Sequence, residues 1–190
     1  MVMRKFRVHT THLVLSFIVF ACCALGQYSV SASPFGQGVF GANVPFGAAT
    51  SLSIALGGNV TLGLTPSGGN FTGSASNAVT VTSTDVIGYR LYAYSPTSTT
   101  MTLVGGGDTI PASANSSPAA LATNTWGYNT TGSTTNFIGM LTTPSLIKDG
   151  VGPFKSGDIT TVTYGAQTSS TKSAGAYTVG IVYTAAAKNP

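Results

Sequence analysis

Near its C-terminus the sequence reads Tyr177-Thr178-Val179-Gly180-Ile181-Val182-Tyr183-Thr184, in which large apolar side chains alternate with small or polar ones. Successive side chains of a β-strand point to opposite faces, so Tyr177, Val179, Ile181 and Tyr183 share one face. The segment is therefore predicted to be a strand with one buried face. The polar turn at 169–175 suggests that it closes a hairpin with the preceding alternating run, which contains Val162 and Tyr164.

Similar alternating runs occur upstream and are separated by Gly, Pro, Asn and Ser. Good helix formers are scarce, because the chain has no Glu and its Lys and Arg are isolated. The sequence therefore predicts an all-β fold, an antiparallel immunoglobulin-like β-sandwich of about seven to nine short strands. Runs at 52–56 and 60–64, joined by Gly57-Gly58-Asn59, predict another hairpin. Most of 107–125 and 129–158 is predicted to be loop.

The N-terminus is typical of a secretory signal peptide over residues 1–32, with basic residues followed by an apolar run of about 13 residues. Cleavage after Gly26 and cleavage after Ala32 both fit, and we favour Ala32. The run is short for a membrane about 30 Å thick, and no later segment is comparably apolar, so we expect no transmembrane anchor in the mature chain. A Gly- and Phe-rich lead-in at 33–50 then precedes the sandwich domain at 51–190.

The net charge of +4 belongs mostly to the leader. Without Arg4, Lys5 and Arg7, five cations face four aspartates, which leaves a net charge of +1. Charged residues make up 6% of the chain, so the surface must consist largely of hydroxyl and amide side chains. This composition gives no basis for a nucleic-acid partner.

His, Cys and Glu are all absent after the leader. The mature chain therefore has no residues for a Ser-His-Asp triad, a Cys-His pair or a His- or Cys-based metal site, and it cannot form a disulfide. We expect no enzyme activity and no cofactor. The alternatives are a hydrolytic pair formed by Asp149 and Asp158, or a calcium site at either residue, but both aspartates lie beside glycines in sequences typical of turns.

The remaining candidates for binding are aromatic. We expect Trp126, Tyr128, Tyr92, Tyr94 and Arg90 to form a ligand-binding surface, because aromatic rings offer flat apolar area to sugars and to protein partners. The structural alternative is that Trp126 is the central core residue and that the tyrosines pack between strands.

The stretch Ser173-Ala174-Gly175-Ala176-Tyr177, with the strand that follows it, resembles the closing hairpin of bacterial WxL-type cell-surface domains. Trp126-Gly127-Tyr128 falls where such domains have another Trp motif, and Tyr183-Thr184-Ala185 stands in place of Trp-x-Leu. The resemblance implies a secreted domain displayed at a bacterial surface.

Two functions follow as expectations. The first is a secreted, non-enzymatic cell-surface protein that binds wall polymer or other surface proteins. The second is a subunit of a surface filament or layer, a homo-oligomer assembled by strand exchange through the lead-in with Phe35, Val39 and Phe40.

Overall fold

A computed structural model describes residues 50–188, which form eleven β-strands and no helix. The predicted signal peptide and nearly all of the predicted lead-in lie outside the described residues. In the described part of the chain, no helix is long and apolar enough to cross a membrane.

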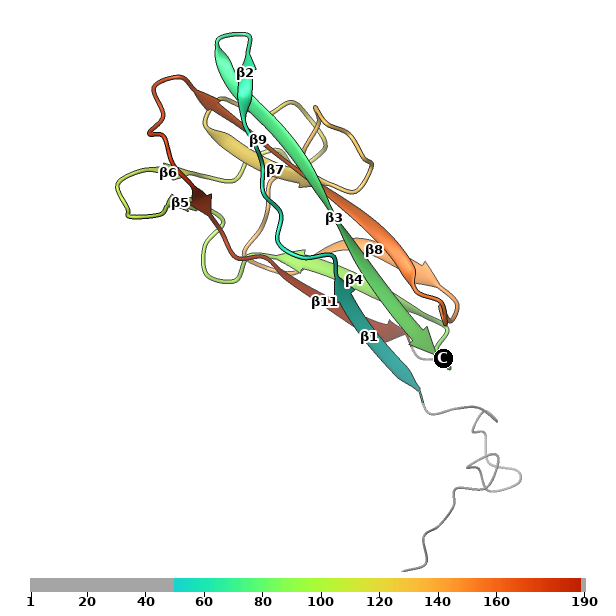
Figure 1. The fold of residues 1–190 in the computed structure, drawn as a ribbon. Helices are drawn as coiled ribbons and strands as arrows, with labels where there is room; N and C mark the ends of the chain where they lie inside the picture. Colours follow the sequence, from blue (N-terminus) through green and yellow to red (C-terminus); the bar gives the residue numbers. More distant parts are fainter. Residues whose placement is uncertain (1–49, 189–190) are drawn as a thin grey trace, which may run out of the picture. The chain divides into compact units, whose positions relative to one another are not determined.

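The larger sheet has five antiparallel strands in the order β1-β3-β9-β7, with β2 also paired to β3. Its strands are β1 (Ser51–Leu56), β2 (Thr65–Ser67), β3 (Asn70–Thr84), β7 (Thr125–Asn129) and β9 (Asp158–Ser169). The long strands β3 and β9 are rich in Thr and Val, whose branched side chains favour extended backbone. Figure 1 shows these two strands running side by side along the domain.

The opposing sheet has three antiparallel strands in the order β11-β4-β8, and a small sheet has the order β10-β5-β6. The strands of the opposing sheet are β4 (Gly88–Tyr94), β8 (Ser145–Val151) and β11 (Val182–Lys188). Those of the small sheet are β5 (Met101–Leu103), β6 (Thr109–Ile110) and β10 (Tyr177–Thr178).

The core lies between the larger and opposing sheets. Both sheets contribute alternate, fully buried side chains, among them Val79 and Val81 from β3 and Tyr89, Leu91 and Ala93 from β4. The predicted all-β, antiparallel sandwich is thus confirmed. Seven of the described strands have five or more residues, but β3, with 15, and β9, with 12, are much longer than expected.

Both predicted hairpins are wrong. β1 pairs with β3 instead of residues 60–64. The amide of Gly57 bonds to the carbonyl of Ala78 at 2.9 Å, and after this point the chain leaves the sheet edge. Likewise β9 pairs with β3 and β7, whereas β11 crosses to β4 in the opposing sheet. Part of the predicted loop at 129–158 forms β8.

Candidate functional site

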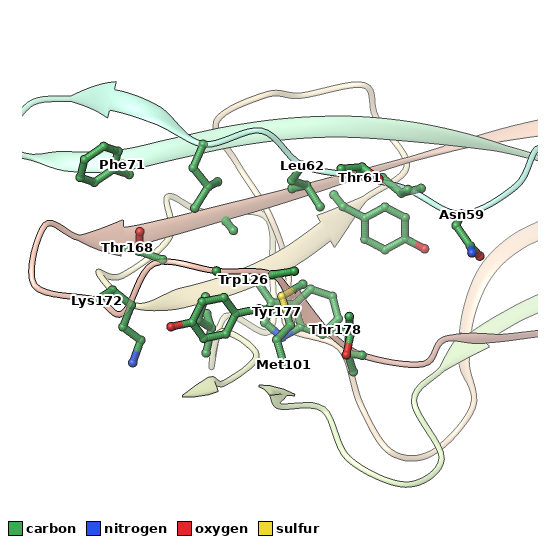
Figure 2. Close-up of a pocket in the computed structure, with 18 of the residues that line it drawn as sticks. Asn59, Thr61, Leu62, Phe71, Met101, Trp126, Thr168, Lys172, Tyr177 and Thr178 are labelled. Atoms are coloured by element: carbon green, nitrogen blue, oxygen red, sulfur yellow. The ribbon is translucent and has the colours of Figure 1, made fainter. Parts of the chain in front are cut away.

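An apolar groove of about 900 Å³ opens between two segments of the domain. One wall is the non-strand segment at 57–64, which connects β1 to β2, and the other is the segment from Tyr177 to Tyr183. The deeper lining consists of Met101, Ile110, Trp126, Tyr164 and Ala166. Figure 2 shows Leu62 on one wall and Tyr177 on the other, with Trp126 and Met101 also facing this region.

Both walls present alternate apolar side chains. On the first wall Val60, Leu62 and Leu64 are half-buried against the core, while the residues between them are exposed. On the second wall Tyr177, Val179, Ile181 and Tyr183 are half-buried in the same way, which confirms the face predicted for them. Incomplete burial of a contiguous apolar strip is typical of a site that receives a partner.

The backbone along both walls is also open to a partner. The second wall begins with β10 and ends with the start of β11, and both are outer strands of their sheets, so one side of the backbone of each has no paired strand within the described residues. The backbone of residues 60–64 makes no hydrogen bond to another backbone group of the described chain. Such unpaired groups are a ready template for another strand.

The topology explains why this edge is open. In a constant-type immunoglobulin sandwich one sheet has the strand order A-B-E-D, and the other sheet contains C, F and a seventh strand, G. Here the order β1-β3-β9-β7 matches the first sheet, and β11 lies beside β4 as F lies beside C. No strand of the described residues occupies the position of G, and the groove lies along that side of the domain.

The aromatic residues of the groove are held by their own hydrogen bonds. The indole nitrogen of Trp126 donates to the carbonyl of Thr99 at 2.8 Å, and the Trp126 and Tyr164 ring centroids are 6.5 Å apart. The hydroxyls of Tyr164 and Tyr183 share a hydrogen bond. Burial is the main cause that raises the pKa of both tyrosines, so these side chains stay uncharged at neutral pH.

Asp108 fixes the turn at one end of the groove. Its carboxylate pairs with the Lys172 ammonium at 2.7 Å and accepts hydrogen bonds from the Ser173 amide and the Tyr177 hydroxyl, both at 3.1 Å. The hydrogen bond from Lys172, followed by those from backbone amides, holds the pKa of Asp108 well below its usual range. The charge of Lys172, which lines the groove, is therefore paired.

Trp126 and Tyr128 are not at the outer surface. They are 0% and 1% exposed, and both lie in the core, so the prediction that they form an external aromatic surface is corrected. The alternative that Trp126 is a core residue is confirmed. The intervening Gly127 faces the other way, where the backbone of Ile138 lies too close for any side chain at position 127.

Arg90, Tyr92 and Tyr94 lie on the outer face of β4, because Leu91 and Ala93 between them are buried. Arg90 is exposed, and the two tyrosines are half-buried. The five predicted binding residues therefore divide between the core and the outer face of the opposing sheet. Alternation in the sequence did indicate the inward face of residues 177–183, but only as the buried face of a strand.

The two aspartates considered for catalysis or calcium binding already have cationic partners. Asp149 pairs with Arg90 and Lys188, and Asp158 pairs with Lys148 at 3.3 Å. Asp158 also accepts a hydrogen bond from the Tyr89 hydroxyl. Within residues 50–188 no three His, Cys, Asp or Glu side chains gather in a group that could hold a metal ion.

Comparisons with known proteins give one structural similarity. No protein-family model matches the chain, and none of the curated proteins matches it. The chain is similar to one in a solved structure described as a chaperone-tip adhesin complex that is vital for synergistic activation of CFA/I fimbriae biogenesis. The sequence identity is 14% and the TM-score is 0.48, over 73% of this chain and 42% of that one. The chain thus spans less than half the length of the protein it matches.

Proposed function

We propose that the protein is a structural subunit of an extracellular surface assembly, in which a β-strand from a second copy of the chain fills the groove. The observation that supports this proposal is the coincidence of an apolar groove with unpaired backbone on both of its walls. Strand addition uses both features, since main-chain hydrogen bonds give affinity and pockets for alternate side chains give specificity.

An exposed strand edge beside apolar surface is a hazard that proteins ordinarily cover, twist away or protect with charge. Here the open edge belongs to β11, whose sequence has a single charge, Lys188, at its last residue. Lys188 pairs with Asp149, so it does not leave an unpaired charge to repel an approaching strand. We therefore interpret the open edge as a functional contact.

The sequence supports both export and a structural role. The signal-peptide pattern at 1–32 supports export, and the absence of His, Cys and Glu from the mature chain supports a structural role instead of a catalytic one. A subunit of this kind also requires no disulfide or metal, because its stability comes from the packed core between the sheets.

Size-exclusion chromatography with light scattering and negative-stain electron microscopy of residues 33–190 would test the assembly. We expect polymers whose length rises with concentration. Ile181→Asp, on the groove wall, should leave a folded monomer, because a buried carboxylate opposes an incoming apolar strand. The control Val151→Asp, at an 81% exposed position outside the groove, should assemble normally. A wild-type chain that stays monomeric would overturn the proposal.

Wall-polymer binding is the second candidate, and the outer face of the opposing sheet favours it. Tyr92 lies opposite the 49% exposed Leu146, and Tyr94 lies opposite the 37% exposed Val182. Two tyrosines beside exposed apolar side chains offer a surface on which sugar rings could stack. Sedimentation with isolated cell walls tests it: Tyr92→Ala with Tyr94→Ala should release the protein, and recovery of the wild type in the supernatant would overturn this candidate.

A further inference from the structure

We infer that the strand that fills the groove is Phe40–Ala48 of a second copy, with its even-numbered side chains facing the core. This inference rests on the proposed function and names the partner segment of the same site. It follows from the alternation in this segment, its lack of charge, its length and its connection to β1.

The segment alternates with a period of two. The even-numbered residues are all apolar: Phe40, Ala42, Val44, Phe46 and Ala48. The four positions between them hold two Gly, one Asn and one Pro. In an extended strand the five even-numbered side chains would share one face. This pattern matches the walls of the groove, where apolar side chains also face inward at every second position.

The segment has no charged residue, and neither does the rest of the lead-in from residue 33 to residue 50. A charge buried in an apolar groove without a partner would be strongly unfavourable, so the lead-in can enter without that cost. The large side chains of Phe40, Val44 and Phe46 are interspersed with the methyl groups of Ala42 and Ala48. A mixture of large and small side chains allows an incoming strand to interdigitate with the side chains of the walls.

Pro45 indicates which edge of the incoming strand faces which wall. Backbone groups of successive residues in a strand point to opposite edges, and proline lacks an N–H, so the odd-numbered edge of this segment has one donor fewer. The even-numbered edge keeps all its donors and is the better partner for β11. The odd-numbered edge would then face residues 60–64, which already lack a regular hydrogen-bond ladder.

The length of the segment also fits. Nine extended residues span about 30 Å at about 3.3 Å per residue. The groove wall from residue 177 to residue 183 has seven residues, so a nine-residue strand passes the whole wall with one residue to spare at each end. Its five inward side chains therefore cover the four inward-facing side chains of that wall.

A second copy is the source because the chain's own lead-in would have to reverse too sharply. Ser51 already pairs with Thr84 in β1, so only Ala49 and Thr50 separate Phe40–Ala48 from the sheet. A two-residue turn needs positive φ, which Gly, Asn and Asp favour and Ala and Thr do not. A longer turn would remove Phe46 and Ala48 from the strand. A neighbouring copy can supply all nine residues.

Disulfide trapping would test the inference, because residues 33–190 contain no cysteine. Leu62→Cys on the groove wall is mixed under mild oxidation with Val44→Cys, an even position, or with the matched control Asn43→Cys, an odd position. We expect a disulfide-linked dimer of two different copies with Val44→Cys and at least tenfold less of it with Asn43→Cys. Placing Val44→Cys and Leu62→Cys in one chain at high dilution tests the intramolecular alternative.

Equal linkage at both positions, no linkage at either, or a disulfide formed within one dilute chain would overturn this inference. If the unmodified chain polymerises but the cysteine variants give any of these results, the proposed function is still supported, with a different strand in the groove. Absence of polymers from the unmodified chain would overturn the proposed function itself. A synthetic peptide of residues 38–50 should shorten the polymers, and a scrambled peptide should not.

Discussion

The Tyr89 hydroxyl donates a 2.7 Å hydrogen bond to Oδ2 of Asp158, which joins β4 of the opposing sheet to β9 of the larger sheet. Tyr89 is fully buried, and its ring meets the ring of Phe154 edge to face at 5.6 Å. Burial, and secondarily the bond to Asp158, raise the pKa of Tyr89 to about 12. The two sheets are thus coupled by a hydrogen bond as well as by apolar packing.

This bond predicts a loss of stability at alkaline pH. The folded protein keeps the Tyr89 proton up to a pKa of about 12, whereas the unfolded chain releases it near 10, so unfolding becomes more favourable as pH rises between these values. Tyr89→Phe should reduce this dependence and lower the free energy of unfolding at neutral pH by about 1 kcal/mol. Denaturant titrations from neutral pH to about pH 11 would measure both effects.

Because Tyr164 and Tyr183 also have raised pKa values, part of the alkaline loss should persist in the variant. A variant profile identical to that of the wild type would contradict the role of Tyr89.

The burial of Trp126 predicts a large effect on folding. Trp126→Ala should lower the free energy of unfolding by about 3–5 kcal/mol, because it removes a fully buried side chain and leaves a cavity. Arg90→Ala, on the exposed face of β4, should change it by less than about 0.5 kcal/mol. Urea titration followed by far-ultraviolet circular dichroism would measure both. A small effect at Trp126 would mean that its side chain is not in the core.

The sequence identified which face of a strand is buried more reliably than which strands pair. Alternation correctly placed Tyr177, Val179, Ile181 and Tyr183 inward, because the period of two is a local property of extended backbone. It could not specify the partner of β11, since pairing with β4 depends on contacts between residues about ninety positions apart. The groove between the walls is a product of that pairing and therefore had no local signal.

Gly165 predicts a steric limit on the outer face of β9. A Cβ atom there would lie 2.2 Å from the Phe137 ring, so Gly165→Ala should destabilise the fold by about 1–3 kcal/mol. Gly180→Ala is the control, since a Cβ at that position meets nothing within 4 Å. Thermal unfolding of both variants would compare them. Equal melting temperatures for the two variants would show that Phe137 does not pack on Gly165.

β8 illustrates why some strands escaped prediction. The residues Lys148-Asp149-Gly150 resemble a turn, but in the fold Asp149 pairs with Arg90 of the neighbouring strand β4. Gly150 leaves room for the Tyr89 ring, which would lie 2.5 Å from a Cβ at that position. Tertiary contacts therefore explain why Asp149 and Gly150 occur within a strand. The sequence likewise did not decide whether Trp126 lies in the core or at the surface, because its burial depends on how neighbouring segments cover β7.

The Asp108 carboxylate predicts an acid-sensitive turn. Its pKa is lowered in the folded state, so its contribution to stability is present above the unfolded value near 3.8 and is lost as pH falls below that value. At neutral pH, Asp108→Asn should free Lys172 and increase tryptic cleavage after it several-fold. Asp85→Asn, at an exposed turn residue with φ of 56°, is the control and should leave cleavage unchanged. Unchanged cleavage in Asp108→Asn would show that the carboxylate does not hold the turn.

Strand addition at β11 is tested most directly by hydrogen–deuterium exchange of residues 33–190 in dilute and in polymerised form. We expect the amides of residues 179–183 that face the groove, which include the first two residues of β11, to exchange at least tenfold more slowly in the polymer. The other edge of the same sheet, Ser145–Val151 in β8, is the internal control and should exchange equally in both forms. Polymers in which residues 179–183 exchange as fast as in the monomer would contradict the account, as would a chain that never polymerises.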